Sequence, residues 1–153
     1  MKKIMLFAAL AFVAISCQDD EAQAIDPVTI EFSHVGKSEL YGDGAENIAG
    51  GNLVINSDAD WQVLLTQMGT VNPLPENFAS DVDFAESTVI AVFDGIRPNG
   101  GFAIDIVSVT QETREITVDV HYPDIDGGNA TTVITQPYHI IKIPKTTLPV
   151  VFE

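Results

Sequence analysis

The sequence predicts an α+β fold made predominantly of antiparallel β-sheet, with a β-sandwich as the alternative arrangement and one packed helix near residues 58–68. Two observations favour this class. Short stretches of alternating apolar and polar residues recur along the chain, and glycine, proline and asparagine separate them, as in hairpin-rich sheets. After the apolar N-terminus, a single segment combines a capping residue with helical apolar spacing, so we expect one helix.

The first expected strand covers residues 28–33, where apolar side chains alternate with polar ones. The glycine-rich stretch 42–51 then predicts a loop or an irregular hairpin. A second short strand is expected at residues 53–55.

The helix is expected to begin after Ser57, whose hydroxyl can accept a hydrogen bond from a free backbone N–H. Asp58 and Asp60 follow in the first turn, where the helix dipole favours negative charge. Gly69 provides a stop. The apolar residues between these ends share one face: Trp61, Leu64, Leu65 and Met68.

The second half of the chain predicts strands only. Residues 88–93 form a continuous apolar run, typical of a strand covered on both faces. Residues 102–109 and 116–122 alternate on either side of a polar turn and predict a hairpin. Beyond a loop at residues 126–129, the remaining expected strands are 131–135, 138–143 and 150–152.

The N-terminus predicts a lipoprotein signal peptide at residues 1–16. Two lysines precede an apolar run that is too short to cross a bilayer, and a loose lipobox ends at Cys17, the one cysteine of the chain. Its thiol can form a thioether with a diacylglycerol before cleavage. The alternatives are an ordinary secretory cleavage site, or a cytosolic protein with an apolar N-terminal helix.

Residues 17–27 are acidic and polar without periodicity and predict a short tether, followed by a single domain at residues 28–153. An acidic run that begins with Gln18 resembles the tether of surface lipoproteins in Bacteroidetes-type bacteria. We therefore expect a location in the cell envelope, anchored by lipid to the outer membrane and exposed at the surface.

The charge of the chain excludes one class of partner. The formal net charge is −15, with 22 acidic residues against 7 lysines and arginines, so phosphate groups would meet a negative field. Nucleic acid is therefore excluded, and contact with membrane is expected through the lipid alone. The acids also keep the protein dispersed, and they could attract a basic partner.

The motifs of common catalytic and metal centres are missing from the sequence. There is no nucleophile elbow, P-loop or zinc-protease motif, and we expect the lipid to occupy Cys17. The three histidines, His34, His121 and His139, are far apart in sequence and are expected at the surface or at strand edges. Residues 124–129 fail the calcium-loop pattern and predict a hairpin loop. We expect a protein that is not an enzyme and has no metal or cofactor.

Three blocks together, residues 59–64, 89–102 and 135–145, resemble the PrcB-like bacterial lipoproteins, named for a non-catalytic subunit of a surface protease complex. The resemblance is strongest from residue 89 to the C-terminus and weaker back to about residue 28. It implies an accessory protein that binds or stabilises a partner protein, such as a protease. Asn99 departs from the family, which often has a small hydroxyl residue there.

The residues expected to contact this partner lie in two of these blocks. Pro98 fixes a backbone angle and the two following glycines permit unusual ones, so this block predicts either a presented loop or a tight turn required by the fold. The complete set is Arg97, Pro98, Asn99, Gly100, Gly101, Phe102, Thr135, Gln136, Pro137 and Tyr138.

Two other functions are weighed as alternatives. Segments 98–102, 126–129 and 136–138 follow the loop order of chagasin-like inhibitors of cysteine proteases, although Gln136 replaces a basic residue and the first loop lacks its threonines. A surface lipoprotein could also bind a small molecule or glycan, with Trp61, Tyr41 or Tyr138 as stacking platforms.

Overall fold

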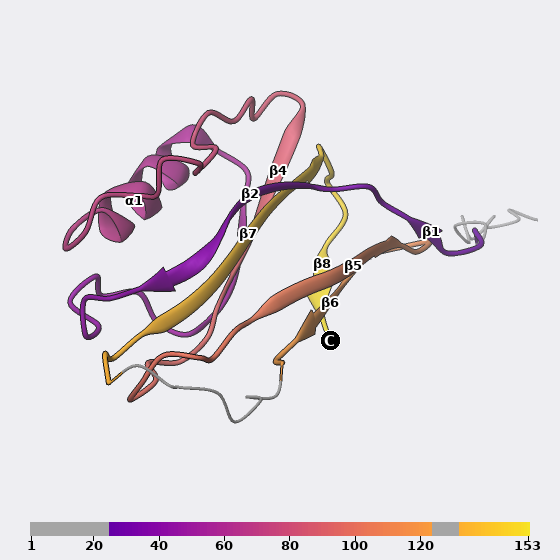
Figure 1. Ribbon diagram of the computed structural model, residues 1–153. Coiled ribbons are helices and arrows are strands. Elements are labelled where there is room, and N and C mark those ends of the chain that lie inside the picture. Colours follow the sequence, from indigo (N-terminus) through magenta and orange to yellow (C-terminus); the bar gives the residue numbers. More distant parts are fainter. Residues whose placement is uncertain (1–24, 124–131) are drawn as a thin grey trace, which may run out of the picture.

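A computed structural model describes residues 25–123 and 132–153 of the chain. In this part the chain forms one helix and two four-stranded sheets (Figure 1). The elements in chain order are β1 (Val28–Thr29), β2 (Ser33–Leu40), β3 (Gly51–Ile55), α1 (Asp58–Met68), β4 (Ser87–Phe93), β5 (Asp105–Gln111), β6 (Ile116–His121), β7 (Gln136–Pro144) and β8 (Val150–Phe152).

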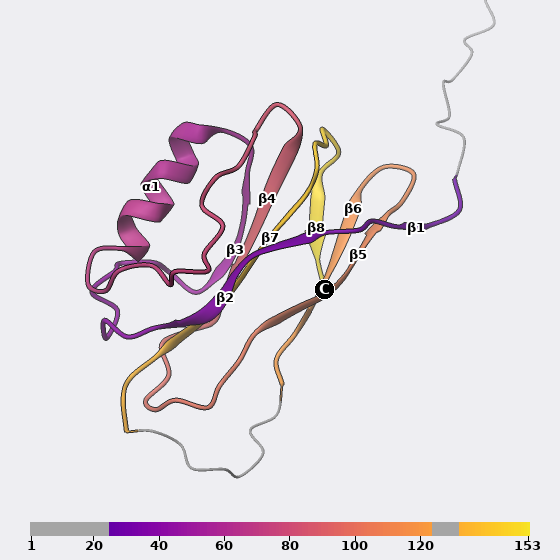
Figure 2. The ribbon, with the colours of Figure 1, turned by 45° about the horizontal axis from the view of Figure 1, so that its top comes forward.

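The two sheets and the helix form three layers. One sheet has the strand order β2-β7-β4-β3 and is antiparallel throughout; the other has the order β1-β5-β6-β8, in which only β6 and β8 run parallel. Helix α1 covers one face of the first sheet, and the second sheet lies on its other face (Figures 1 and 2). The predicted fold class, α+β with a sandwich-like pair of sheets, is confirmed.

Strands β4 and β7 form the centre of the molecule, because both of their faces are buried. In β4, Val89, Ala91 and Phe93 pack toward α1, whereas Ile90 and Val92 pack toward the second sheet. The predicted apolar run at 88–93 thus belongs to a strand covered on both sides. Each large apolar side chain buried here contributes about 1.5–3 kcal/mol, so this strand pair is the main source of stability.

Helix α1 has the predicted bounds and the predicted cap. The Ser57 hydroxyl accepts a hydrogen bond from the N–H of Asp60 at 3.3 Å, and the N–H of Gly69 donates to the carbonyl of Leu65 at 3.0 Å. Trp61 is fully buried, and its indole N–H donates to the carbonyl of Ser80 at 2.8 Å. The helix is therefore fixed both to the sheet and to the segment that follows it.

The start of the domain differs from the prediction. The expected strand at residues 28–33 is split: β1 pairs with β5 in one sheet, and the chain then crosses to the other sheet, where β2 pairs with β7. The expected strand at 131–135 is also wrong over its described part, because Thr135 forms only an isolated bridge with Arg97. The predicted β5–β6 hairpin is present.

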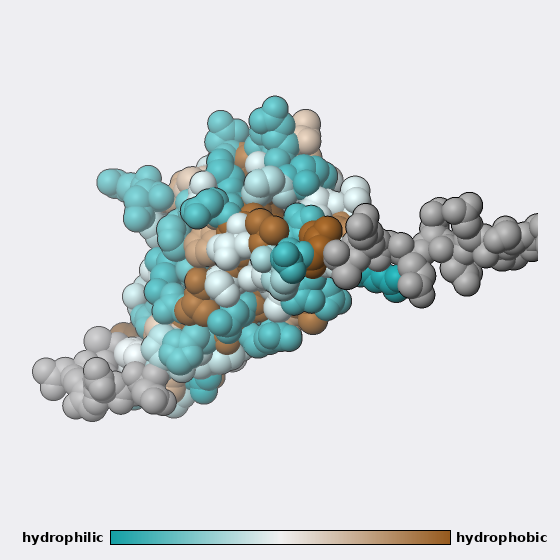
Figure 3. Space-filling model, turned by 90° about the vertical axis from the view of Figure 1, so that its right-hand side faces the viewer, coloured by the Kyte–Doolittle hydropathy of each residue, from teal (hydrophilic) through white to brown (hydrophobic). Residues whose placement is uncertain are grey.

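Several predicted features lie outside the described residues: the signal peptide, Cys17, most of the tether and the loop at 126–129. Among the residues that are described, no helix has the length and apolar character needed to cross a membrane. The side of the molecule that carries β1, β5, β6 and β8 shows hydrophobic side chains scattered among hydrophilic ones (Figure 3).

Candidate functional site: the loop end

Two loops and the start of β7 meet at one end of the molecule, which we call the loop end: residues 41–50 after β2, residues 94–104 after β4, and residues 133–138. The side-chain amide of Gln136 joins all three. Its Nε2 donates to the carbonyl of Ile48 and to the carbonyl of Asp94, both at 3.0 Å. The predicted partner-binding residues all lie here.

The 94–104 loop is organised around an ion pair. The side chain of Asp94 is 7% exposed, and the Arg97 guanidinium donates to it twice, from Nε at 2.6 Å and from Nη2 at 2.7 Å. The N–H of Gly95 adds a third hydrogen bond at 2.7 Å. Hydrogen bonding to Asp94 raises the pKa of Arg97 further above its usual value. All of these bonds are charge-assisted, and together they satisfy this carboxylate.

Further contacts fix the rest of this loop. The Arg97 guanidinium lies over the ring of Phe102, 4.7 Å from its centre, which is a cation–π distance. The backbone of Arg97 pairs with Thr135, whose hydroxyl also donates to the carbonyl of Asn99 at 3.1 Å. Gly101 has a φ of 95°, a region that favours glycine. The loop therefore has one defined shape.

The predicted contact residues divide into an outer and an inner group. Pro98 and Gly101 are exposed, and Arg97, Asn99 and Phe102 are half-buried. Gly100 and the whole segment Thr135–Tyr138 are buried. The inner residues hold the loop in place from beneath, so a partner can touch only the outer ones. The sequence does not show which predicted contact residues are buried. Strand β7 is covered on both faces, so its residues do not alternate between apolar and polar as those of a half-exposed strand would.

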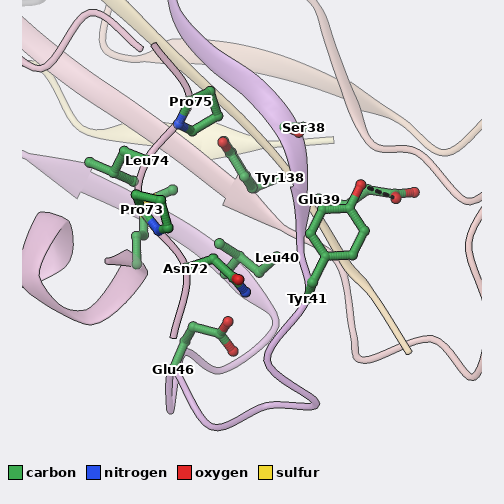
Figure 4. A pocket seen from close by; sticks show the side chains of 11 residues that line it. Ser38, Glu39, Leu40, Tyr41, Glu46, Asn72, Pro73, Leu74, Pro75 and Tyr138 are labelled. Carbon is green, nitrogen blue, oxygen red and sulfur yellow. Dashed lines mark hydrogen bonds between the residues drawn. The ribbon is translucent and has the colours of Figure 1, made fainter. Parts of the chain in front are cut away.

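A pocket of about 80 Å³ opens beside the edge strand β2, between the 41–50 loop and the segment after α1 (Figure 4). Leu40, Met68 and Leu74 supply apolar wall, and the carboxylate of Glu46 points in toward Asn72 (Figure 4). Tyr138 also lines it; burial raises the pKa of its hydroxyl to about 12, and hydrogen bonding with Ser38 opposes that rise.

Glu46 is the feature of this pocket that the sequence did not reveal. It is 2% exposed, and neither carboxylate oxygen has a hydrogen-bond partner among the described residues. Asp43 and Asn47, on either side of it, have left-handed φ values of 52° and 54°, a region that aspartate and asparagine enter more readily than other non-glycine residues. Glu46 therefore sits in a loop that holds a carboxylate where nothing in the described chain neutralises it.

A second polar cluster lies between the sheets. His139 is 1% exposed and stacks on His34, with 2.8 Å between His139 Nε2 and His34 Nδ1. The N–H of Ile106 donates to His139 Nδ1 at 2.9 Å, so a neutral His139 carries its proton on Nε2 and donates it to His34. The expectation that each histidine lies at the surface or a strand edge is wrong for His139, which is in a central strand.

The surroundings of His139 disfavour its charged form. Burial, followed by the neighbouring His34 and Lys37, lowers its pKa to about 4, although Asp105, 3.6 Å from Nδ1, acts in the opposite direction. Lys37 itself is paired with Asp105. Within residues 25–123 and 132–153, no group of three histidine, cysteine or acidic side chains is placed to hold a metal ion.

The class of protein defined by this arrangement is a two-sheet α+β domain with one covering helix. Residues 88–144 match the family model described as PrcB C-terminal, so this part of the chain is similar to that domain. Comparison with curated proteins and with solved structures gives no match.

Proposed function

We propose that this protein is a lipid-anchored accessory protein of the outer membrane that binds a partner protein of a protease complex through its loop end, without catalysing a reaction itself. The observation that carries this proposal is the fixed 94–104 loop, which lies inside the segment matching the PrcB family. A loop that is already ordered loses little conformational entropy on binding.

Large apolar side chains exposed around this loop support a protein partner. Tyr41, Ile96, Tyr122 and Val133 lie at this end, and each is about half exposed; Ile96, at 53%, projects from the 94–104 loop itself. Aromatic and aliphatic side chains of this kind form the centres of protein interfaces. Their position on a rigid frame favours docking of a folded partner.

The position of Ile25 indicates how a lipid anchor at Cys17 would orient the domain. The backbone N–H of Ile25 bonds to the Thr113 hydroxyl in the β5–β6 turn, at the end of the molecule opposite the loop end (Figure 1). A tether that leaves from there would direct the loop end away from the membrane and toward a partner. Metabolic labelling with a fatty-acid analogue should label the wild type and not Cys17→Ala.

The partner-binding role is tested by affinity capture from solubilised cell envelopes. Ile96→Asp places a charge in the centre of the proposed surface and should abolish capture of a stoichiometric partner. Val151→Asp makes the same kind of change in exposed β8 and should leave capture intact. Equal recovery with both variants would exclude the loop end as the binding surface.

The two alternative functions gain little support from the site. Gln136, Pro137 and Tyr138 form a buried part of β7, so they cannot enter a protease as an inhibitory loop would. The second loop of that comparison lies outside the described residues. Of the three proposed stacking platforms, Trp61 and Tyr138 are buried and Tyr41 alone is exposed.

A further inference from the structure

The unpartnered carboxylate of Glu46 is the starting point. A carboxylate removed from water without hydrogen bonds is costly, and buried acids are normally paired. Both Glu46 oxygens lack a partner among the described residues; the carboxylate lies against Gly42 and points toward Asn72 at the wall of the pocket (Figure 4). The Glu46 carboxylate is therefore placed as in a buried ion pair, but the chain supplies no described cation to complete the pair.

Two turns and a glycine hold Glu46 in this arrangement. Two turns, closed by the N–H of Ala45 to Gly42 and the N–H of Asn47 to Gly44, fix the loop on both sides of Glu46. A side chain at Gly42 would place its Cβ 2.1 Å from Glu46 Oε1, so this glycine leaves room for the carboxylate.

The pocket has the shape and lining for an aliphatic stem that ends in a cation. Its volume of about 80 Å³ is several times the ~10–15 Å³ that one water needs. Leu40, Met68 and Leu74 are apolar residues that line the same pocket as Glu46. A lysine or arginine side chain combines these two features, with donors for one or both free oxygens.

We propose that the Glu46 pocket binds a lysine or arginine side chain of the partner protein. This inference rests on the proposed function and adds the chemistry of recognition. Tyr41, an exposed residue of the loop end, lines the pocket, and Glu39 lies beside it, so a basic segment would contact both. A net charge of −15 attracts a basic partner over a distance. A single carboxylate provides too few ligands for Ca²⁺ or Mg²⁺.

The test uses the full chain in solution and needs no natural partner. The chain contains three methionines, Met1, Met5 and Met68, so ¹³C-methyl labelling of methionine provides a reporter in the pocket wall. The ligands are Nα-acetyl-lysine methylamide, Nα-acetyl-arginine methylamide and, as the neutral analogue, Nα-acetyl-norleucine methylamide. We expect a saturable shift of the Met68 signal with at least one cation and none with norleucine, and the tighter ligand identifies the preferred side chain.

Glu46→Gln keeps the shape of the side chain and removes its charge. It should weaken binding of the cation by about tenfold or more, as expected for loss of a charge-assisted pair. Glu112→Gln, at an exposed glutamate of the β5–β6 turn, is the matched control and should bind as the wild type does. Gly42→Ala keeps the charge and displaces the carboxylate, so it should also weaken binding.

Three results of the titrations would overturn the proposal: no saturable shift of Met68 with either cation, an equal response to norleucine, or unchanged affinity in Glu46→Gln. Thermal unfolding without ligand separates a binding role from a structural one, because Glu46→Gln should unfold at the same or a higher temperature. A lower temperature would mean that Glu46 stabilises the fold, which contradicts the proposal. None of these outcomes depends on whether capture finds a partner.

Discussion

Two neighbouring loops at the loop end each bury a carboxylate, and the two carboxylates differ in the number of hydrogen-bond donors around them. Asp94 is surrounded by donors, two from Arg97 and one from the N–H of Gly95. Glu46 is buried at least as deeply, and neither of its oxygens meets a donor in the described part of the chain. The two loops lie close enough for the Gln136 amide to bond to both.

The contrast indicates a structural role for Asp94 and fits the ligand-binding role proposed for Glu46. A buried ion pair completed within the chain fixes a conformation and cannot serve a partner without being broken. A buried acid without a partner lowers the stability of the fold, and a donor from a ligand can satisfy it. In the proposed function, the 94–104 loop would supply a rigid surface and the 41–50 loop would supply its specificity. Substitutions at the two acids and their neighbours should therefore change the free energy of unfolding in opposite directions and by different amounts.

The largest effect is expected for Arg97→Met, which leaves Asp94 buried and unpaired. Removing one partner of a buried pair typically costs 3–5 kcal/mol, and because the Arg97 side chain is 35% exposed we expect about 3 kcal/mol in the free energy of unfolding. Urea denaturation measures this. The double variant with Asp94→Leu should recover most of the loss, and a double variant as unstable as the single one would show that the pair is not the cause.

The histidine pair predicts a pH dependence of similar size. The pKa of His139 is lowered in the folded state from 6.5 to about 4, so its contribution is complete above pH 6.5 and is lost as the pH falls toward 4. The shift corresponds to roughly 3 kcal/mol. His139→Gln should make stability less dependent on pH in this window, as followed by urea denaturation at several pH values. His121→Gln, at an exposed position, should leave the slope as in the wild type.

The difference between local and distant determinants also explains what the sequence could predict. The bounds of α1 follow from a cap, a stop and a four-residue stripe, all within 13 consecutive positions. Strand β4 follows from a run of apolar residues. Strand β2 has no such signal, because it is an edge strand with a bulge that sends only Val35 and Leu40 into the core. The amino-acid pattern around it looks like a polar loop.

The same contrast between local signals and distant contacts explains why only part of the site was predictable. The 94–104 loop could be located because Pro98, Gly100 and Gly101 act through their own backbone. Glu46 gave no signal, since its burial depends on residues from the end of α1, the following segment and β7. His34 and His139 are 105 positions apart, and only the pairing of β2 with β7 brings them together. Contacts of this kind arise from the fold, not from local patterns.

An intermediate effect is expected for Gln136→Met, which removes the link between the two loops. The carbonyls of Ile48 and Asp94 would each lose a buried donor, and a buried acceptor left unpaired costs about 1–3 kcal/mol. We expect a loss of about 2 kcal/mol, with faster amide hydrogen exchange in residues 41–50 and 94–104. Exchange that rises in one loop alone would show that the loops are not coupled through this side chain.

The smallest effect is expected for Glu46→Gln, and making the same chemical change at Asp94 tests the comparison most directly. Asp94→Asn should lower the free energy of unfolding, since an amide replaces one accepting oxygen with a donor that faces the Arg97 guanidinium. Glu46→Gln should raise it by up to about 1 kcal/mol, because a neutral group costs less to bury than an unpaired charge. Acids at functional sites commonly reduce stability in this way. Urea denaturation of both variants at pH 7 gives the two signs, and a loss of stability at both positions would mean that Glu46, like Asp94, is a structural acid.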